Sequence, residues 1–353
     1  MGDPARQSLL DLTDIELDAL VGPPAFRTRQ LRAWLYERAV EDVEAMSDLP
    51  ARVRTRLAAV GVGSLNTVDR QSGDDGMTIK WLFESHRTRF ETVLMRYPKR
   101  ATVCVSSQAG CAQGCPFCAT GLGGFERHLS TGEIVEQVLV ARRHLCDLRD
   151  NDPGDSSRSP AHVTNVVFMG MGEPLANYAN VMSAIGRLNR DCQIGARSLT
   201  VSTIGIPARI RSLATDAPQV TLAWSLHAAD DELRNRLVPP NKRWPIAAVL
   251  DSIGDYHAAG GRRVTIEYTL MRGVNDSPEQ ASALAALVGP LHAHVNLIAM
   301  NPVGTTAYGP SDPNVVAGFA RTLDAAGINA TVRANRGTDI GGACGQLNAD
   351  TRR

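Results

Sequence analysis

The sequence of 353 residues contains no uninterrupted apolar run of about 18 residues, the length that a membrane-spanning helix needs. It also lacks an excess of charge, because 37 basic side chains balance 37 acidic ones. Bulk charge therefore gives no attraction to nucleic acid, and any contact with RNA must come from local basic clusters. Acidic residues follow Met1–Arg6 closely, at Asp11, Asp14 and Glu16, which is untypical of a signal peptide. We expect a cytoplasmic protein with no membrane association.

Cysteine is scarce, and in a reducing compartment its seven residues are more often ligands or catalysts than disulfide partners. Three of them, Cys111, Cys115 and Cys118, have the spacing C-x3-C-x2-C. Three such thiolates can hold a [4Fe–4S] cluster and leave its fourth iron free to chelate S-adenosylmethionine (SAM). The alternative is a structural zinc site, which needs four ligands, usually in two pairs. His128 is a candidate fourth ligand, but the paired cysteines are missing, and the spacing favours the cluster.

Short β-rich runs alternate with helical stretches after about residue 101, which predicts an α/β fold with a parallel sheet, either open or curled into a barrel. A hydrophobic content of 43% is enough for a sizeable core. The polar segment from Asp147 to Pro160 is expected to form a mobile surface loop. The expected strands are Thr102–Val105, Val163–Phe168, Ser198–Ser202, Val220–Ser225, Val264–Leu270 and Val295–Met300, with Ala330–Ala334 as a further candidate.

The chain divides into three expected regions. Residues 1–60 show helical periodicity and predict a small N-terminal accessory domain that contacts RNA. Residues 61–100 are expected to form a short β-hairpin linker, with strands at 78–83 and 88–95. Residues 101–347 are expected to form the barrel and a C-terminal catalytic loop.

Polar groups or glycines follow most of the expected strands. The cysteine triad follows the first strand, and Gly172-Glu173 follows the second. Ser202-Thr203, Ser225-Leu226-His227 and Asn301 follow three later strands. In α/β barrels the chemistry lies at the carboxyl ends of strands, so these side chains are expected to share one rim. An acid beside flexible glycines suits an ammonium group, although a plain strand-to-helix turn has the same composition.

Two further cysteines stand apart from the triad. Cys104 precedes it by seven residues, and Cys344 lies near the C-terminus in the glycine-rich run DIGGACGQL. From the residues alone, the two could be idle thiols, disulfide partners or a nucleophile. Cys146 and Cys192 are interpreted as structural residues.

The cysteine spacing, with Phe117 before the third cysteine, resembles the radical SAM superfamily. MGMGEP at 169–174 is similar to the superfamily's Gly-Gly-Glu motif. More extended motifs resemble the RlmN/Cfr group of radical SAM RNA adenine methyltransferases over residues 10–347. They are RFETVLM (89–95), CVSSQAGC (104–111), CAQGCPFCATG (111–121), MGMGEPLANY (169–178), SLHA (225–228), LVPPNKRWP (237–245), VNLIAMNP (295–302) and DIGGACGQL (339–347).

This resemblance implies a partial (βα)6 radical SAM barrel with a small helical N-terminal domain. It implies a [4Fe–4S] cluster that cleaves S-adenosyl-L-methionine to a 5′-deoxyadenosyl radical, and a low-potential electron donor of the flavodoxin or ferredoxin type. The long N-terminal region resembles the branch that methylates adenine C2 in 23S rRNA, at the peptidyl-transferase centre, and in the anticodon loop of tRNA. The related branch methylates C8, which stays an alternative. A monomer is expected.

The resemblance also implies roles for three residues, with two SAM molecules used per turnover. Cys344 takes a methyl group from the first SAM to become S-methylcysteine. The radical from the second removes a hydrogen from that methyl, and the resulting carbon adds to adenine as a covalent protein–RNA adduct. Cys104 then attacks the sulfur of Cys344, forming a disulfide and releasing the methylated base. Glu91 matches the proton acceptor, although an acid in an alternating strand is usually a solvated residue.

The contacts to SAM that the resemblance implies are Gly172, Glu173, Ser202, Ser225, Leu226, His227 and Asn301. Thr203 is the alternative to Ser202, because both follow the same strand in VSTIG.

Local basic clusters offer contacts to RNA phosphates, and Tyr97 or Trp34 offers a stacking surface. A run of arginines on a helix is more often a solvated face. The clusters are Arg27, Arg29 and Arg32; Arg52, Arg54 and Arg56; and Arg96, Lys99 and Arg100. A protein of a different class, an iron–sulfur RNA-binding sensor without turnover, would need the triad but neither Cys104 nor Cys344.

Overall fold

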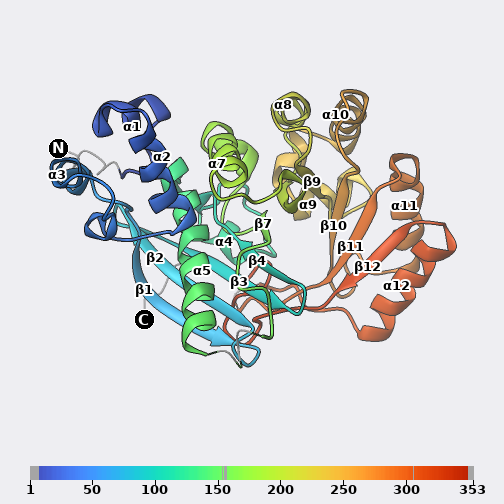
Figure 1. Cartoon of the computed structure of the whole chain (residues 1–353). Coiled ribbons are helices and arrows are strands. Elements are labelled where there is room, and N and C mark those ends of the chain that lie inside the picture. Colours follow the sequence, from blue (N-terminus) through green and yellow to red (C-terminus); the bar gives the residue numbers. More distant parts are fainter. Residues whose placement is uncertain (1–7, 153, 155–156, 305, 349–353) are drawn as a thin grey trace.

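The computed structural model describes residues 8–348 except 153, 155–156 and 305. The first seven residues of the predicted N-terminal domain lie outside this range. The central feature is one ten-stranded sheet with the strand order β1-β2-β3-β4-β7-β8-β9-β10-β11-β12. Figure 1 shows helices along the outer side of the parallel strands and the N-terminal helices beside α5 at one end. No helix in the described part of the chain is long and apolar enough to cross a membrane.

The N-terminal region folds as a group of short helices. Thr13 begins the first of them with a capping box, in which its side chain and that of Glu16 each bond the other's backbone N–H. The helices share one continuous hydrophobic core with the sheet, and Arg187 fastens them to α7 through the carbonyl oxygens of Leu10 and Leu12. The elements are α1 (Asp14–Val21), α2 (Phe26–Arg32), the π-helix η1 (Ala33–Glu37), η2 (Val43–Ala45) and α3 (Ala51–Val60).

Three antiparallel strands then lead into the sheet: β1 (Asn66–Gly73), β2 (Thr78–Ser85) and β3 (Thr88–Tyr97). The hairpin expected at 78–83 and 88–95 is present as β2 and β3. Sequence reasoning missed β1, because seven of its eight residues are exposed and it has no apolar alternation. These strands continue directly into the main sheet through the antiparallel pairing of β3 with β4. The division of the chain at 60 and 100 remains a prediction.

The remaining strands of the sheet are parallel, and each expected strand is found within two residues of its expected limits. The predicted α/β fold with a helical N-terminal region is therefore confirmed. The strands are β4 (Arg100–Cys104), β7 (Asn165–Phe168), β8 (Leu199–Thr203), β9 (Thr221–Ser225), β10 (Thr265–Leu270), β11 (His294–Ala299) and β12 (Asn329–Arg333). A separate small sheet pairs β5 (Gln108–Gly110) with β6 (Phe125–His128).

Helices connect the parallel strands. The longest, α5 (Thr131–Asn151), begins at a capping box of Ser130 and Glu133, as its sequence predicts. It extends through Asn151, so the surface loop expected from Asp147 to Pro160 was wrong for its first five residues. The other α-helices described are α4 (Ala119–Leu122), α7 (Tyr178–Arg190), α8 (Pro207–Asp216), α9 (Asp231–Leu237), α10 (Ile246–Ala258), α11 (Pro278–Val288) and α12 (Pro313–Ala325). Short 3-10 helices are present at η3 (Pro174–Asn177), η4 (Ala196–Ser198), η5 (Pro239–Lys242) and η6 (Gly289–Leu291).

Candidate active site

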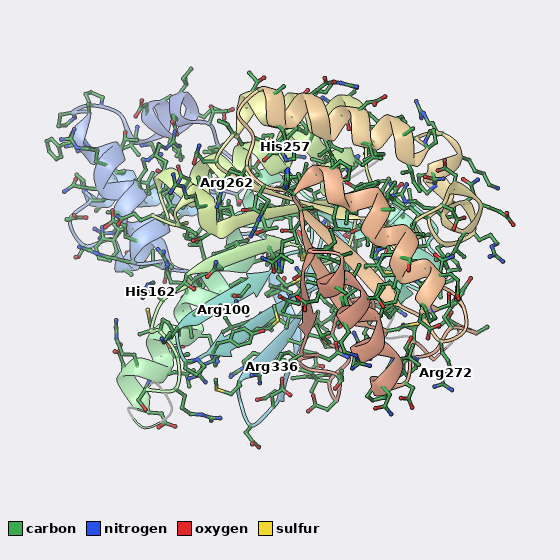
Figure 2. The ribbon with its side chains drawn as sticks, turned by 90° about the vertical axis from the view of Figure 1, so that its right-hand side faces the viewer. Arg100, His162, His257, Arg262, Arg272 and Arg336 are labelled. Atoms are coloured by element: carbon green, nitrogen blue, oxygen red, sulfur yellow. The ribbon has the colours of Figure 1, made fainter. Side chains whose placement is uncertain are left out.

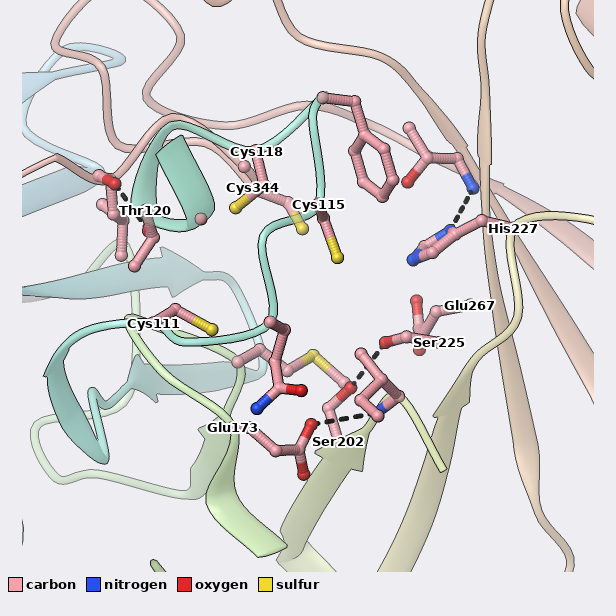
Figure 3. A pocket seen from close by; sticks show the side chains of 18 of the residues that line it. Cys111, Cys115, Cys118, Thr120, Glu173, Ser202, Ser225, His227, Glu267 and Cys344 are labelled. Carbon is pink, nitrogen blue, oxygen red and sulfur yellow. Dashed lines mark hydrogen bonds between the residues drawn. The ribbon is translucent and has the colours of Figure 1, made fainter. Parts of the chain in front are cut away.

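The carboxyl ends of the parallel strands surround a cavity with about 1070 Å³ of empty space, including its open mouth. We name it the central cavity, and its place at the carboxyl ends of parallel strands suits a cofactor or small-molecule site. Figure 3 shows side chains from the loop after β5 and from several strand ends pointing into it. Of the predicted cluster and SAM residues, it is lined by Cys111, Cys115, Cys118, Gly172, Glu173, Ser202, Ser225, His227 and Asn301.

The loop after β5 brings the three cysteine thiols to one side of this cavity. Gly121 lets the loop fold tightly, because a Cβ there would lie 3.0 Å from the backbone of Cys115. The backbone N–H of Cys111 donates to the carbonyl of Gly124, and that of Cys118 donates to Cys115. Burial raises the pKa of Cys111 to about 12 and that of Cys115 well above its ordinary value. Unaided, these two thiols stay protonated at neutral pH, so bound iron would have to displace their protons.

The arrangement of the thiols fits a cluster. Sulfur atoms bound to one zinc ion at about 2.3 Å lie within roughly 4 Å of each other. Among the described residues, no group of three or more His, Cys, Asp or Glu side chains is arranged to hold a single metal ion. All three thiols line the central cavity, so each could bind a separate iron of one cluster. His128, the candidate fourth zinc ligand, does not line the cavity and instead meets Gln108, at 2.9 Å.

The end of β7 carries the acid of the predicted SAM site. Gly172 has a φ of 101°, and a Cβ there would lie 2.5 Å from the Gln108 side chain. The buried carboxylate of Glu173 accepts hydrogen bonds from the backbone N–H groups of Leu175 (3.0 Å) and Ile204 (2.9 Å). Burial nevertheless raises the pKa of Glu173 to about 7. A bound ammonium group would offset this desolvation and hold the carboxylate ionised.

The ends of β8 and β9 meet through their serines. The hydroxyl oxygens of Ser202 and Ser225 lie 3.1 Å apart, and both residues line the central cavity. Thr203, the alternative to Ser202, also lines the cavity, but its side chain bonds Glu173 and the N–H of Gly205. The Ser202 hydroxyl therefore has fewer hydrogen-bond partners within the described residues than that of Thr203 and is more available to a ligand. Both residues remain candidates for the SAM contact.

His227 presents one ring nitrogen to the central cavity. Its Nδ1 accepts from the N–H of Thr269 at 3.1 Å, which places the proton of the neutral ring on Nε2. Burial, reinforced by the Arg234 cation, lowers the pKa of His227 to about 3, so the ring stays neutral. Phe117 from the cysteine loop contacts this ring edge to face at 5.0 Å between centroids. The cysteine loop and the end of β9 are thereby joined.

Leu226 and Asn301 differ in how they meet the predicted site. The Leu226 side chain is fully buried and does not line the cavity, and its N–H donates to the carbonyl of Glu267. Asn301 lines the cavity and donates to the carbonyl of Cys344 at 3.0 Å. Its buried Oδ1 has no hydrogen-bond partner among the described residues. That free acceptor suits a donor on a bound ligand.

Sequence reasoning missed two charged residues of this cavity, Glu267 on β10 and Arg333 at the end of β12. Oε1 of Glu267 accepts from Asn296 at 2.9 Å, and Oε2 lies 3.6 Å from Arg333. Burial raises the pKa of Glu267, and the Arg333 cation opposes that rise. The only sequence signal was a charged residue within the otherwise uncharged strand TIEYTL.

A second cavity opens beside the first, and we name it the thiol cavity because Cys104 and Cys344 both line it. Cys344 and Arg333 line both cavities, so the Cys344 side chain lies where the two spaces meet. The protein around the Cys104 sulfur raises its pKa to about 12, and the Cys344 thiol adds to that rise. Cys344 is exposed as a residue, but desolvation of its sulfur raises its pKa to about 11, and the Arg333 cation opposes the rise at both thiols. Both are free thiols in this structure, so the predicted disulfide is not formed here.

Glu91 lies on β3 outside both cavities but contacts the loop that carries Cys344. Its buried carboxylate is 2.8 Å from the Lys80 ammonium and accepts from the N–H of Asn348 at 2.7 Å. Burial raises the pKa of Glu91, while Lys80 and the Asn348 N–H oppose the rise. Glu91 therefore fastens the C-terminal loop, beyond any role in proton transfer. Cys146 and Cys192 line neither cavity, as expected for structural residues.

A cavity at the carboxyl ends of parallel strands, with three cysteines on one wall, defines a radical SAM enzyme, and residues 157–285 match the family described as "Radical SAM superfamily". The matched range begins after the cysteine loop. The crystal structure of a radical SAM methyltransferase from Sphaerobacter thermophilus is similar over 98% of this chain and 100% of its own, with a TM-score of 0.90 and 44% identity. Enzymes of this class use a [4Fe–4S] cluster and SAM, as predicted for this chain.

Two further similarities assign the chain to one family of radical SAM methyltransferases. Residues 7–62 match the family described as "Ribosomal RNA large subunit methyltransferase N-terminal domain". A probable dual-specificity RNA methyltransferase RlmN from Parafrankia sp. is 49% identical, covering 97% of this chain and 91% of that protein. Another, from Mycobacterium bovis, is also 49% identical, covering 94% of this chain and 91% of its own. The chain belongs to the RlmN family, which confirms the resemblance seen in its motifs.

Proposed function

We propose that this protein methylates C2 of an adenine in 23S rRNA and in tRNA. The relatives named above as dual-specificity RNA methyltransferases support the two substrates, and the match of the N-terminal region to a ribosomal RNA methyltransferase domain supports the first. The observation that carries the proposal is the place of Cys344, which lines both the central cavity and the thiol cavity. A residue there can receive a methyl group from one side and present it to a base on the other.

Adenine C2 is an electron-poor carbon, and its direct attack on a methylsulfonium is unfavourable. When bound by Cys111, Cys115 and Cys118, the cluster would supply the electron that cleaves SAM. Glu173 would hold the ammonium group of SAM, and the Ser202 and Ser225 hydroxyls and the Asn301 Oδ1 would meet its remaining polar groups. His227 offers Nε2–H as a donor on the same wall.

The other residues of the proposal handle the methyl group. Cys344 accepts it as S-methylcysteine and holds its carbon toward the base. Cys104, in the same cavity, attacks the Cys344 sulfur, so that a disulfide forms as the methylated base leaves. Glu91, held beside Lys80 and Asn348, accepts the proton of adenine C2. A flavodoxin-like or ferredoxin-like protein supplies electrons to the monomer in the cytoplasm.

The proposal is tested by incubating reconstituted, reduced protein with 23S rRNA or tRNA and methyl-labelled SAM, followed by mass spectrometry of the digested RNA. We expect 2-methyladenosine from both RNAs, and none from the Cys344→Ala variant. Methylation at C8 would assign the chemistry to the related branch of the group. Full activity of Cys344→Ala would refute the proposed methyl carrier.

A further inference from the structure

We propose that Tyr97, Arg100 and Arg336 form a phosphate clamp at the rim of the thiol cavity, which holds the RNA backbone next to the target adenine. The inference rests on the proposed function and adds to it the residues that grip the substrate. Three observations support it: Arg100 and Arg336 both lie over the Tyr97 ring, Tyr97 and Arg336 line the thiol cavity, and most other candidate arginines are bound by protein groups.

Two guanidinium groups stack on one aromatic ring. The Arg100 carbon Cζ lies 4.2 Å from the centroid of the Tyr97 ring, and that of Arg336 lies 5.1 Å from it. Arg100 begins β4, whereas Arg336 follows β12, so distant parts of the chain meet at Tyr97. Figure 2 shows Arg100 and Arg336 on the same side of the molecule. A guanidinium that lies over the face of a ring can still donate its N–H groups to a phosphate.

The stack borders the thiol cavity itself. Tyr97 and Arg336 line that cavity together with Cys104 and Cys344. A base that enters from this side to reach Cys344 leaves its sugar and phosphates at the rim, because a flipped nucleotide stays attached to its backbone. Cations at that rim would therefore meet the phosphates on either side of the target nucleotide.

These cations are available to a ligand. Arg100 is exposed and has no carboxylate partner among the described residues. The carboxylate that Arg336 reaches in the described part of the chain is Asp74, at 3.9 Å. The same Asp74 oxygen already accepts from the Thr78 hydroxyl at 2.5 Å and the Gly337 N–H at 3.0 Å. An ion pair of that length is weak and leaves the guanidinium open to a phosphate.

Most other basic candidates are occupied by protein groups. The Arg96 side chain is buried and donates to Ser159, so it was wrongly grouped with Lys99 and Arg100 as an RNA contact. Arg32 pairs with Asp14 and Asp191. In the same clusters, Arg27, Arg54 and Arg56 donate to backbone carbonyls. Arg29 and Arg52 are exposed but line neither cavity. Trp34, the other stacking candidate, carries Arg38 on its ring and lines neither cavity.

The test measures the affinity of the protein for a tRNA transcript at several salt concentrations. Arg100→Gln and Arg336→Gln are compared singly and together with wild type. Arg263→Gln is the matched control, because Arg263 is an exposed cation just before β10 that lines neither cavity. Arg100→Gln breaks no side-chain hydrogen bond or ion pair with the described residues and loses the contact with Tyr97, so we expect the variant to fold. Cluster absorbance and the unfolding temperature verify that each variant is folded.

We expect the double variant to bind RNA about tenfold more weakly than wild type at physiological salt, which is the effect expected from the loss of two solvent-exposed contacts to phosphates. The slope of log K against log salt should fall in magnitude by about 1.4, because each phosphate contact on a single strand contributes about 0.7. Arg263→Gln should change neither quantity. If wild type binds and methylates RNA but the double variant binds it with the same affinity and slope, the clamp is wrong and the proposed function stands. If wild type neither binds nor methylates RNA, the proposed function fails and the clamp fails with it.

Discussion

The backbone N–H of Asn348 donates a hydrogen bond of 2.7 Å to Oε2 of Glu91, which joins the C-terminal loop to strand β3. Oε1 of the same carboxylate lies 2.8 Å from the Lys80 ammonium. The loop so held carries Cys344, and Leu347 beside Asn348 lines both cavities. Glu91 therefore has two separable tasks in this account: to anchor the loop and to accept a proton.

Glu91→Gln separates these tasks, because the amide oxygen can still accept from the Asn348 N–H while the amide has no basic site. We expect Cys344 to be methylated normally and transfer to RNA to slow by about 10²-fold or more, the usual contribution of a general base. Mass spectrometry of the protein and of the RNA measures the two steps. Loss of Cys344 methylation itself would indicate that the charge on Glu91 serves only to hold the loop.

Cys104→Ala removes the proposed resolving thiol and leaves Cys344 in place. We expect a covalent protein–RNA adduct to accumulate, visible as a shifted band on a denaturing gel, because no neighbouring sulfur can release the base. Cys192→Ala is the control, since Cys192 is a free thiol that lines neither cavity. Turnover of Cys104→Ala without any adduct would count against the resolving role.

Gly172→Ala tests the SAM site at the end of β7. The added methyl group would lie 2.5 Å from Gln108, and a φ of 101° is unfavourable for alanine. Gln108 accepts from the Glu173 N–H, so its displacement also moves the acid. We expect affinity for SAM, measured by equilibrium dialysis, to fall about tenfold. Gly186→Ala, in α7 with no atom near its added Cβ, should bind SAM as wild type does; equal affinities for all three proteins would refute the assignment.

Glu136 predicts a pH dependence of stability. It is buried on α5, accepts from the N–H groups of Ser64 and Leu65, and its burial raises its pKa to about 7 from 4.5. The folded state thus binds the Glu136 proton more tightly than the unfolded state does. The stability that this proton gives to the fold is complete below about pH 4.5 and is lost as pH rises through 7.

Glu136→Gln keeps an acceptor but cannot ionise. We therefore expect the stability of the variant relative to wild type to increase by about 3 kcal/mol between pH 4.5 and pH 8, measured by urea unfolding. A stability difference that stays constant over this range would contradict the raised pKa. The variant is chosen away from the cavities so that cofactor binding does not enter the comparison.

The sequence predicted the parallel strands well, because buried strands such as Thr221–Ser225 are short apolar runs between turn residues. It also predicted that groups at separate strand ends meet at one rim, since parallel strands present their carboxyl ends together. Polar β1 escaped detection because it is recognised only by its pairing with β2. The end of α5 at Asn151 was missed because polar residues suit an exposed helix as well as a loop.

Residues whose roles depend on long-range contacts could not be predicted. Glu267 lies inside a strand, and only the packing of β12 against β11 brings Arg333 to it. Arg234 was likewise missed; its guanidinium donates to the carbonyl oxygens of Leu226, Ile204 and Ser225 and so fixes two strand ends together. Periodicity and motif spacing contain no information about such pairings.

The central claim is that the loop of Cys111, Cys115 and Cys118 holds a [4Fe–4S] cluster that cleaves SAM reductively. The most direct test is to reconstitute the protein with iron and sulfide without oxygen, reduce it with dithionite in the presence of SAM, and measure 5′-deoxyadenosine. The account predicts about four irons per chain and release of 5′-deoxyadenosine that is lost when the three cysteines are replaced by alanine. A protein that binds only zinc, or that forms no 5′-deoxyadenosine when fully loaded with iron, would contradict it.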